Sequence, residues 1–275
     1  MRKLCIASWT GYDITDIEAL PLIAEAGFDG FFPDWEPEKD MNKIAAVAKD
    51  CGLFLQSVHG PFGNMDKMWE PGAEGDAAAR ELIECLRVCE KIGAPIMVAH
   101  AIIGMDKHEP NDIGVERFAL VAREAERVGV MLALENVEGI EYLLKLRDTI
   151  GDMPSVRYCW DSGHEMCYNG SMDVPALYNG KLICTHLNDN CGQTDPAMVT
   201  WHDDSHMMPF DGKADWRGIA DRLNREKYEG PLTFELTCLN KPGRHTHEIY
   251  STLSPAEFFK KAYDKAVEVE KLVER

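Results

Sequence analysis

Short hydrophobic segments alternate with longer amphipathic segments along the whole chain. Eight of the hydrophobic segments are five to seven residues long and rich in β-branched and aromatic residues, which is typical of strands covered on both faces. These predicted strands are LCIAS (4–8), GFFPDW (30–35), LFLQSVH (53–59), PIMVAHA (95–101), MLALEN (131–136), VRYCWD (156–161), LICTHL (182–187) and LTFELT (232–237).

Helical spacing of apolar residues marks the segments between these strands. The predicted helices are 14–27, 38–52, 78–94, 114–129, a weaker one at 140–150, a short one at 173–179, 215–228 and 254–274. Several of them end in a glycine that can cap a helix, namely Gly27, Gly52, Gly93 and Gly129.

Eight strand and helix pairs without an intervening linker predict one domain over 1–275, an α/β single (β/α)8 TIM barrel. An open doubly wound sheet is the alternative, but no GxGxxG follows the first strand.

Composition narrows the classes of function. The chain has 275 residues, 45% of them hydrophobic and 28% charged, which excludes a disordered or fibrous protein. A net charge of -18 disfavours nucleic acid and anionic membranes as partners. No apolar run reaches the roughly 18 to 20 residues of a membrane span. The nine cysteines include no CxxC pair and predict reduced thiols, so we expect a soluble cytoplasmic protein; a homo-oligomer is compatible with the sequence.

Ionisable residues stand at the carboxyl ends of six predicted strands, where a TIM barrel builds its active site. They are His59, His100, Glu135, Asp161, His186 and Glu235. Carboxylates gathered at one barrel mouth repel each other unless a cation neutralises them. No Lys or Arg occupies a matching strand end, so we predict one divalent metal ion. Three carboxylates and one imidazole suit Mn, Mg or Co, and Zn is compatible.

Five motifs occur in an order that resembles the xylose-isomerase-like TIM-barrel superfamily. They are LENVEG (134–139), WDSGH (160–164), THLND (185–189), Asp204-Ser205-His206 followed by Pro209 and Gly212, and FELT (234–237). That superfamily includes ketose 3-epimerases, hydroxypyruvate isomerases, inosose dehydratases and the endonuclease IV group. The resemblance implies a metal ion held by Glu135, Asp161, His186 and Glu235.

The same resemblance implies that Glu135 and Glu235 form the catalytic acid/base pair. This role agrees with elementary chemistry, because a metal-bound hydroxy-ketose has an acidified α-carbon and carboxylates can remove and return its proton. The expected function is a metal-dependent sugar or sugar phosphate isomerase or epimerase, acting through an enediolate on a small sugar substrate. The sequence leaves the sugar, and the choice among isomerisation, epimerisation and dehydration, open.

Five further residues are assigned to substrate binding or a second metal, namely His59, His100, His164, Asp204 and His206. Together with the first four they match the ligand set of the endonuclease IV group, so a multi-metal phosphodiesterase is the alternative function. A sugar-binding barrel without turnover is the third. Residues 186–216 contain Lys213 as their only Lys or Arg, which argues against a DNA-binding groove.

The chain departs from the usual ketose 3-epimerase motifs at two places that bear on substrate contacts. Ketose 3-epimerases usually carry an arginine shortly after the strand-seven histidine, whereas this chain reads HLNDNCG, and their P-G-x-G reads Pro209-Phe210-Asp211-Gly212 here. No phosphate-binding glycine loop is visible, and the basic residues in loops are scattered. Aromatic residues near strand ends are assigned to walls that stack on a sugar ring, namely Trp9, Phe62 and Trp201, with Trp35 and Trp69 as further candidates.

Overall fold

The computed structural model describes residues 2–105 and 109–274, in which the strands form a closed parallel barrel. One sheet has the order β3-β2-β1-β9 and the other β4-β5-β6-β7-β8. Bridges between Asp34 and His59, and between Leu187 and Phe234, join the two sheets at both seams. The strands are β1 (Leu4–Ala7), β2 (Gly30–Phe32), β3 (Phe54–Leu55), β4 (Val58–His59), β5 (Ile96–His100), β6 (Met131–Glu135), β7 (Val156–Asp161), β8 (Leu182–His186) and β9 (Leu232–Phe234). The predicted TIM barrel is therefore confirmed.

The third predicted strand is divided into two short segments, β3 and β4. The first pairs with β2 and the second with β5, so the 53–59 segment changes partner along its length. Pro33 has no N–H to donate, and the regular ladder of β2 stops at Phe32. Pairing resumes one residue later, where His59 N donates to Pro33 O at 2.9 Å. This change of partner places His59 at the barrel mouth.

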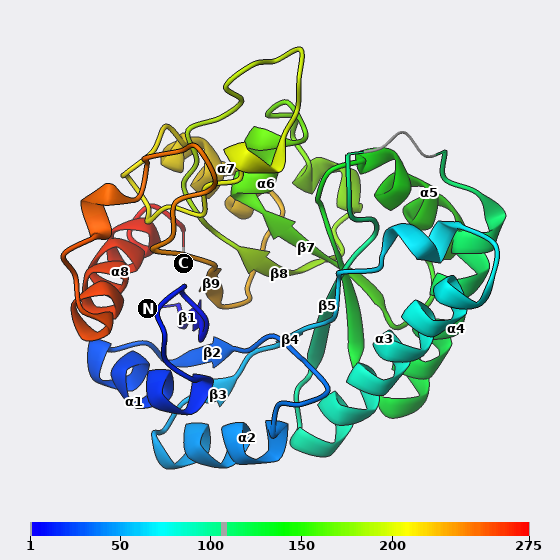
Figure 1. Cartoon of the computed structure of the whole chain (residues 1–275), viewed down its shortest axis with the longest axis horizontal. Coiled ribbons are helices and arrows are strands. Elements are labelled where there is room, and N and C mark those ends of the chain that lie inside the picture. The colour runs from blue at the N-terminus through cyan, green and yellow to red at the C-terminus, as the bar shows by residue number, and fades with distance from the viewer. Residues whose placement is uncertain (1, 106–108, 275) are drawn as a thin grey trace.

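Helices cover the outside of the barrel (Figure 1). They are α1 (Asp16–Ala26), α2 (Met41–Asp50), α3 (Ala73–Ile92), α4 (Asp112–Val128), α5 (Ile140–Ile150), α6 (Ser162–Cys167), α7 (Trp216–Arg225) and α8 (Pro255–Glu270). Short 3-10 turns are η1 (Asp66–Trp69), η2 (Pro175–Tyr178), η3 (Trp201–Asp203) and η4 (Glu248–Tyr250). Seven of the eight predicted helices are confirmed; the segment near 173–179 is the 3-10 turn η2, and α6 was not predicted.

Local signals explain where several helices begin and end. Both α1 and α8 start with a capping box, Thr15 with Glu18 and Ser254 with Glu257. Helix α3 ends at Gly93, which adopts a left-handed φ of 76° that a residue with a Cβ rarely adopts. In the described part of the chain, no helix combines the length and the apolar character needed to cross a bilayer.

The alternation of strand side chains separates the barrel interior from the layer beneath the helices. A small buried cluster on the interior side of β5–β8 consists of Val98, Ala133, Cys159 and Cys184. Each of these residues lies two positions before a strand-end residue with candidate chemistry, respectively His100, Glu135, Asp161 and His186. Residues two apart in a strand share a face. His100, Glu135, Asp161 and His186 therefore point to the same interior side as the cluster residues, at the mouth of the barrel.

Candidate metal centre

Four predicted metal ligands converge at the carboxyl ends of adjacent strands. Glu135, Asp161 and His186 are the last residues of β6, β7 and β8, and Glu235 follows β9 directly. One ligand atom from each residue lies within 4.8 Å of the others. Nδ1 of His186 lies 2.8 Å from Oε1 of Glu135 and 2.9 Å from Oε2 of Glu235. This set of oxygen and imidazole donors fits a divalent cation.

The ring of His186 is held in one orientation by its surroundings. It stacks on Phe32 of β2, with ring centroids 4.6 Å apart and an interplanar angle of 8°. The imidazole is fully buried, as is the carboxylate of Glu135, whereas the side chain of Glu235 is 25% exposed. Consequently Glu235 is the glutamate of the pair that faces the cavity at the mouth.

In this cluster, protonated imidazoles neutralise the negative charge of the neighbouring carboxylates. Burial opposes ionisation of Glu135, but His186, His100 and His59 outweigh it and hold the pKa of Glu135 well below its usual range. Burial also raises the pKa of Glu235, but the neighbouring His186 lowers it by more. The pKa of Glu235 therefore falls to about 2. The two carboxylates in turn raise the pKa of His186 well above its usual value despite burial. A cation of charge two would replace the protonated rings as the neutralising charge.

Asp161 both ends β7 and caps the next helix. Its Oδ1 accepts a hydrogen bond of 2.6 Å from the backbone of His164, and its Oδ2 accepts one of 2.9 Å from Nδ2 of Asn188. Burial, together with the nearby Glu135 and Glu235, raises the pKa of Asp161 to about 6 even though histidines oppose the shift. The carboxylate is therefore oriented from two sides before any metal binds.

Two histidines flank Glu135 on one side of the centre. Nε2 of His59 lies 3.4 Å from Glu135 Oε2, and Nε2 of His100 lies 3.3 Å from the same oxygen. The Nδ1 of His59 is 2.8 Å from Gly60 O, so the ring donates there and its other nitrogen is directed to the carboxylate. His59 is buried, which lowers its pKa, yet the hydrogen bond with Glu135 raises that pKa to about 9.

A second flank surrounds Asp204 between α6 and the long β8–α7 loop. His206 Nε2 lies 3.0 Å from Asp204 Oδ1, and His164 Nε2 lies 3.5 Å from Asp204 Oδ2. Burial lowers the pKa of His206, but Asp204 raises it to about 9. His164 and His206 also reach Asp161 closely enough to hold an ion with it. All nine residues singled out in the sequence thus meet at one mouth.

The cavity above this cluster contains residues that the sequence analysis did not assign to the site. They are Asp34, Ile103, Glu138, Tyr168 and Lys241. Asp34 is the penultimate residue of the second predicted strand, GFFPDW, so its place near a strand end is a sequence signal for the site. Lys241 follows β9 by seven residues in an irregular loop, and only the three-dimensional structure places its amine 3.5 Å from Asp204.

The predicted aromatic walls divide into two groups. Trp9, Phe62 and Trp201 line the cavity and are 50%, 43% and 48% exposed. Trp35 and Trp69 were wrongly assigned, because both are buried in the hydrophobic core. The indole N–H of Trp69 donates to Ala101 O at 2.7 Å, which satisfies its polar group away from the mouth.

Comparison with known proteins identifies the family. A family model described as xylose isomerase-like TIM barrel matches residues 20–260. The chain belongs to the xylose isomerase-like TIM barrel family. A relative by sequence is the uncharacterized protein y4fM of Sinorhizobium fredii, 26% identical over 98% of this chain and 95% of that protein.

Solved structures share the fold across nearly the whole chain. D-psicose 3-epimerase from Clostridium cellulolyticum H10, solved with D-tagatose, superposes with a TM-score of 0.76 and 16% identity, covering 98% of this chain and 99% of that one. The 3-keto-D-glucoside 4-epimerase from E. coli gives a TM-score of 0.69 and 17% identity, covering 98% and 100%. At this level of identity, the likeness shows a common fold.

Proposed function

We propose that this protein is a divalent-metal-dependent sugar isomerase or epimerase that moves a proton next to a carbonyl through an enediolate. The observation that carries the proposal is the pair of glutamate oxygens at 2.8 and 2.9 Å from one nitrogen of His186, with Asp161 beside them. The solved structures of similar fold named above are sugar epimerases, which supports the same class of reaction. A bound metal ion would polarise the substrate carbonyl and acidify the adjacent carbon.

The two glutamates occupy different positions relative to a bound sugar. Glu235 lines the mouth cavity, so its carboxylate can exchange a proton with a substrate carbon directly. Glu135 lies beneath His59 and His100 and is fully buried. Its part in the proton transfer requires that the surrounding imidazoles shift when substrate binds. We propose that His164 and His206, both of which contact Asp204, bind hydroxyl groups of the substrate.

Charges around the mouth favour a neutral sugar over a sugar phosphate. The residues lining the cavity include four carboxylates, from Asp34, Glu138, Asp204 and Glu235. Lys241 is the one Lys or Arg in that described lining, and Asp204 already contacts it. Once a bound metal ion has displaced the protons of His59 and His206, a phosphate dianion would face these carboxylates without a matching set of Lys or Arg donors.

Isotope exchange tests the proposal. Purified protein loaded with Mn²⁺ or Co²⁺ is incubated with a panel of ketoses and keto-sugars in deuterated water, and products are analysed by mass spectrometry and NMR. Deuterium on a carbon next to the carbonyl is the expected result, because proton abstraction exchanges that hydrogen with solvent. Sugar binding without any exchange across the panel would instead identify a non-catalytic sugar-binding barrel.

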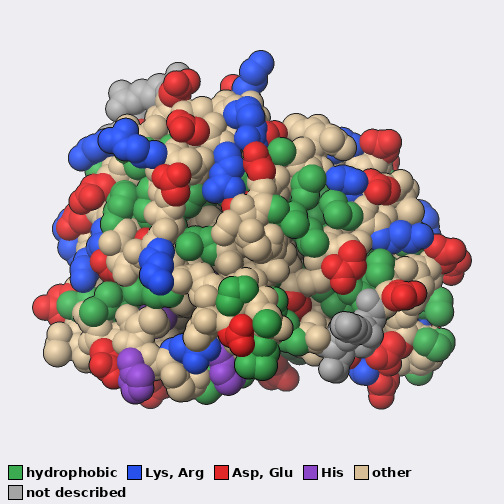
Figure 2. Space-filling model, turned by 90° about the horizontal axis from the view of Figure 1, so that it is seen from above, with side chains coloured by type: hydrophobic (Ala, Val, Ile, Leu, Met, Phe, Trp, Pro, Cys, Tyr) green, Lys and Arg blue, Asp and Glu red, His purple; other side chains and the backbone are tan. Residues whose placement is uncertain are grey.

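A multi-metal phosphodiesterase is the second candidate, because three overlapping ligand groups lie side by side. They are His59, His100 and Glu135; Glu135, Asp161, His186 and Glu235; and Asp161, His164 and His206. The surface charge opposes this function. The face in Figure 2 shows acidic and basic side chains intermixed, and the whole chain carries a net charge of -18. Such a surface offers a polyanionic duplex little favourable electrostatic binding energy.

A further inference from the structure

Two thiols lie in the barrel interior beneath the candidate metal centre. Cys159 of β7 and Cys184 of β8 are paired residues of neighbouring parallel strands, and both are fully buried. Each lies two positions before a predicted ligand, Asp161 or His186, and therefore shares its face of the strand. The proposed proton transfer uses neither sulfur atom. The two thiols thus form a group of soft donors next to the oxygen-rich mouth.

The imidazole of His186 connects this group with the mouth. Its Nδ1 lies 2.8 Å from Glu135 Oε1 and 2.9 Å from Glu235 Oε2. A ring nitrogen of His186 and the sulfur atoms of Cys159 and Cys184 all lie within 4.8 Å of one another. Nε2 of the ring is buried and forms no hydrogen bond of regular geometry with any described residue. Because buried polar atoms nearly always have a partner, Nε2 is the nitrogen left for an ion beside the thiols.

A buried amide supports one of the two sulfur atoms. Gln56 lies between β3 and β4, and its Nε2 donates to Cys184 Sγ at 3.3 Å. The hydroxyl of Ser57 donates to Oε1 of Gln56 at 2.5 Å, which fixes the orientation of the amide. An N–H directed at sulfur stabilises a thiolate, and such support of a ligand by a neighbouring donor is typical of metal sites. The surroundings of Cys184 therefore suit a charged sulfur ligand.

We infer that Cys159, Cys184 and Nε2 of His186 form a binding site, the thiol site, for a thiophilic divalent cation of the class of Zn²⁺ or Cd²⁺. Two thiolates and one imidazole are donors that such ions prefer. A divalent ion also neutralises two thiolates, so the site buries no net charge. Tetrahedral zinc holds its ligands at about 2.0 to 2.3 Å, which places the donor atoms roughly 3.3 to 3.8 Å apart. Rotation of the thiol side chains provides this approach.

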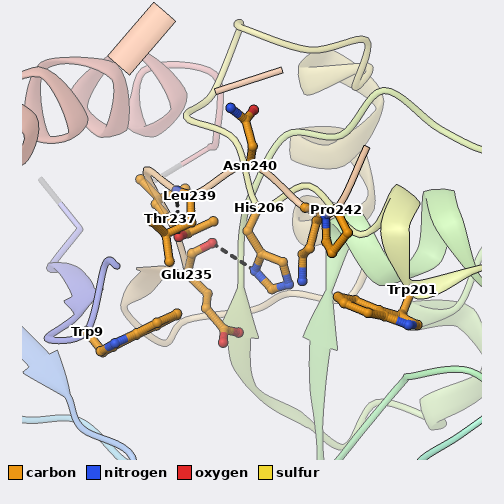
Figure 3. Close-up of a pocket in the computed structure, with 10 residues that line it drawn as sticks. Trp9, Trp201, His206, Glu235, Thr237, Leu239, Asn240 and Pro242 are labelled. Carbon is orange, nitrogen blue, oxygen red and sulfur yellow. Dashed lines mark hydrogen bonds between the residues drawn. The ribbon is translucent and has the colours of Figure 1, made fainter. Parts of the chain in front are cut away.

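The entry path for an ion is the barrel mouth. The side chain of Glu235 is 25% exposed there. Figure 3 shows its carboxylate and the ring of His206 between Trp9 and Trp201. A carboxylate at the entrance attracts cations, and Cys184 lies two residues deeper in β8 than His186. The mouth and the thiol site are therefore reached by the same route.

The shared imidazole makes the two sites exclude each other. A neutral imidazole offers one lone pair to a metal, because its other nitrogen carries a proton. With an ion on Nε2 of His186, Nδ1 keeps the proton and donates it to Glu135 and Glu235, an arrangement common behind zinc-bound histidines. The mouth then lacks its imidazole ligand. A thiophilic ion at the thiol site is therefore an inhibitor of metal-dependent chemistry at the mouth.

Cadmium titration of the full chain, kept reduced with a phosphine, tests the thiol site without requiring turnover. Thiolate ligation of Cd²⁺ produces sulfur-to-metal charge-transfer absorption in the ultraviolet, whereas ligation by oxygen and nitrogen alone does not. We expect this absorption to saturate at about one Cd²⁺ per chain. X-ray absorption at the cadmium edge is expected to find two sulfur neighbours. Absence of the sulfur band, or a sulfur count other than two, overturns the inference.

Matched variants locate the bound ion. Cys159→Ala and Cys184→Ala are each expected to weaken Cd²⁺ binding, followed by the sulfur band, at least about 100-fold, because a lost ligand costs more than a lost supporting group. Cys89→Ala is the control, since Cys89 is equally buried but lies on α3. Circular dichroism melting verifies folding, and the wild-type sulfur count decides if a variant does not fold. An unchanged sulfur band in both site variants overturns the inference.

Competition with Mn²⁺ tests the shared imidazole. Mn²⁺-loaded protein is titrated with Cd²⁺ while the electron paramagnetic resonance signal of released Mn²⁺ is followed. We expect release in step with the sulfur band, and Cd²⁺ affinity at least about tenfold weaker than in metal-free protein. In Cys184→Ala, release requires more Cd²⁺; release at an unchanged concentration would show direct exchange at the mouth and overturn the exclusion. Band growth with all Mn²⁺ retained would also overturn it.

The outcomes for the thiol site and for the proposed function are separate. A wild-type chain that binds no Mn²⁺ but gives the sulfur band contradicts the proposed metal-dependent isomerase and supports the thiol site. A chain that binds Mn²⁺ and exchanges deuterium into sugars, but gives no sulfur band with Cd²⁺, supports the isomerase and overturns the thiol site.

Discussion

The side chain of Asn188 donates a hydrogen bond of 2.9 Å to Oδ2 of Asp161, so a residue just after β8 orients a candidate metal ligand at the end of the neighbouring strand β7. The space for this contact comes from Gly163. A Cβ at position 163 would lie 1.9 Å from Oδ1 of Asn188. Glycine in WDSGH and asparagine in THLND are therefore two parts of one support for Asp161.

Gly163→Ala is expected to displace Asn188 and release Asp161 from its orientation. We predict a loss of about 1–3 kcal/mol in the free energy of unfolding, from overpacking, and a loss of roughly 10- to 100-fold in metal affinity. Chemical denaturation and metal titration measure the two effects. Gly63→Ala is the control, because a Cβ there meets nothing within 4 Å. Wild-type metal affinity in Gly163→Ala would show that Asn188 does not support the ligand.

Glu235→Gln is expected to lower turnover by roughly 10²- to 10⁴-fold, because an amide cannot exchange the proton that the exposed carboxylate handles. Glu135→Gln is expected to be at least as damaging and also to weaken metal binding, since Glu135 lies among three imidazoles. Steady-state kinetics and metal analysis measure these changes. Glu36→Gln, a substitution on an exposed side chain, serves as the control. Near-normal activity in either site variant would refute the two-glutamate mechanism.

Metal stoichiometry separates the sugar enzyme from the phosphodiesterase. We predict about one tightly bound divalent ion per chain and no incision of a duplex containing an abasic site, at low or near-physiological salt. Elemental analysis and a gel-based incision assay provide the measurement. Three zinc ions per chain, with incision that disappears in His59→Ala or His206→Ala, would favour the phosphodiesterase instead.

Metal affinity is expected to rise with pH between about 6 and 9. Nearby carboxylates raise the pKa values of His59 and His206 to about 9 against the opposing effect of burial, so both rings hold protons in the metal-free protein below that pH. The positive charge of a divalent cation lowers the pKa values of both rings, so metal binding releases their protons. Calorimetry in buffers of different ionisation enthalpy counts the released protons. Affinity that stays constant over this range, or proton uptake, would contradict the proposed charge balance.

Most strand-end residues of the site follow from local patterns. Apolar residues at alternate positions of a strand share its interior face, and the next such position beyond Cys159 or Cys184 is Asp161 or His186. The carboxyl ends of parallel strands meet at one mouth, so these residues converge once the barrel is recognised. Their roles in metal binding and catalysis stay predictions.

The loop residues show where local patterns stop being sufficient. Trp9 and Trp35 both stand near strand ends in the sequence, yet Trp9 is half exposed at the mouth and Trp35 is only 5% exposed. Lys241 reaches Asp204 from a distant loop, and no spacing rule links the two. The sequence by itself determined the barrel and which strand-end side chains point into its mouth, because side chains alternate between the two faces within each strand. Only the tertiary structure decided which aromatic and charged loop residues line the cavity, because packing between segments far apart in the chain sets where each loop side chain lies.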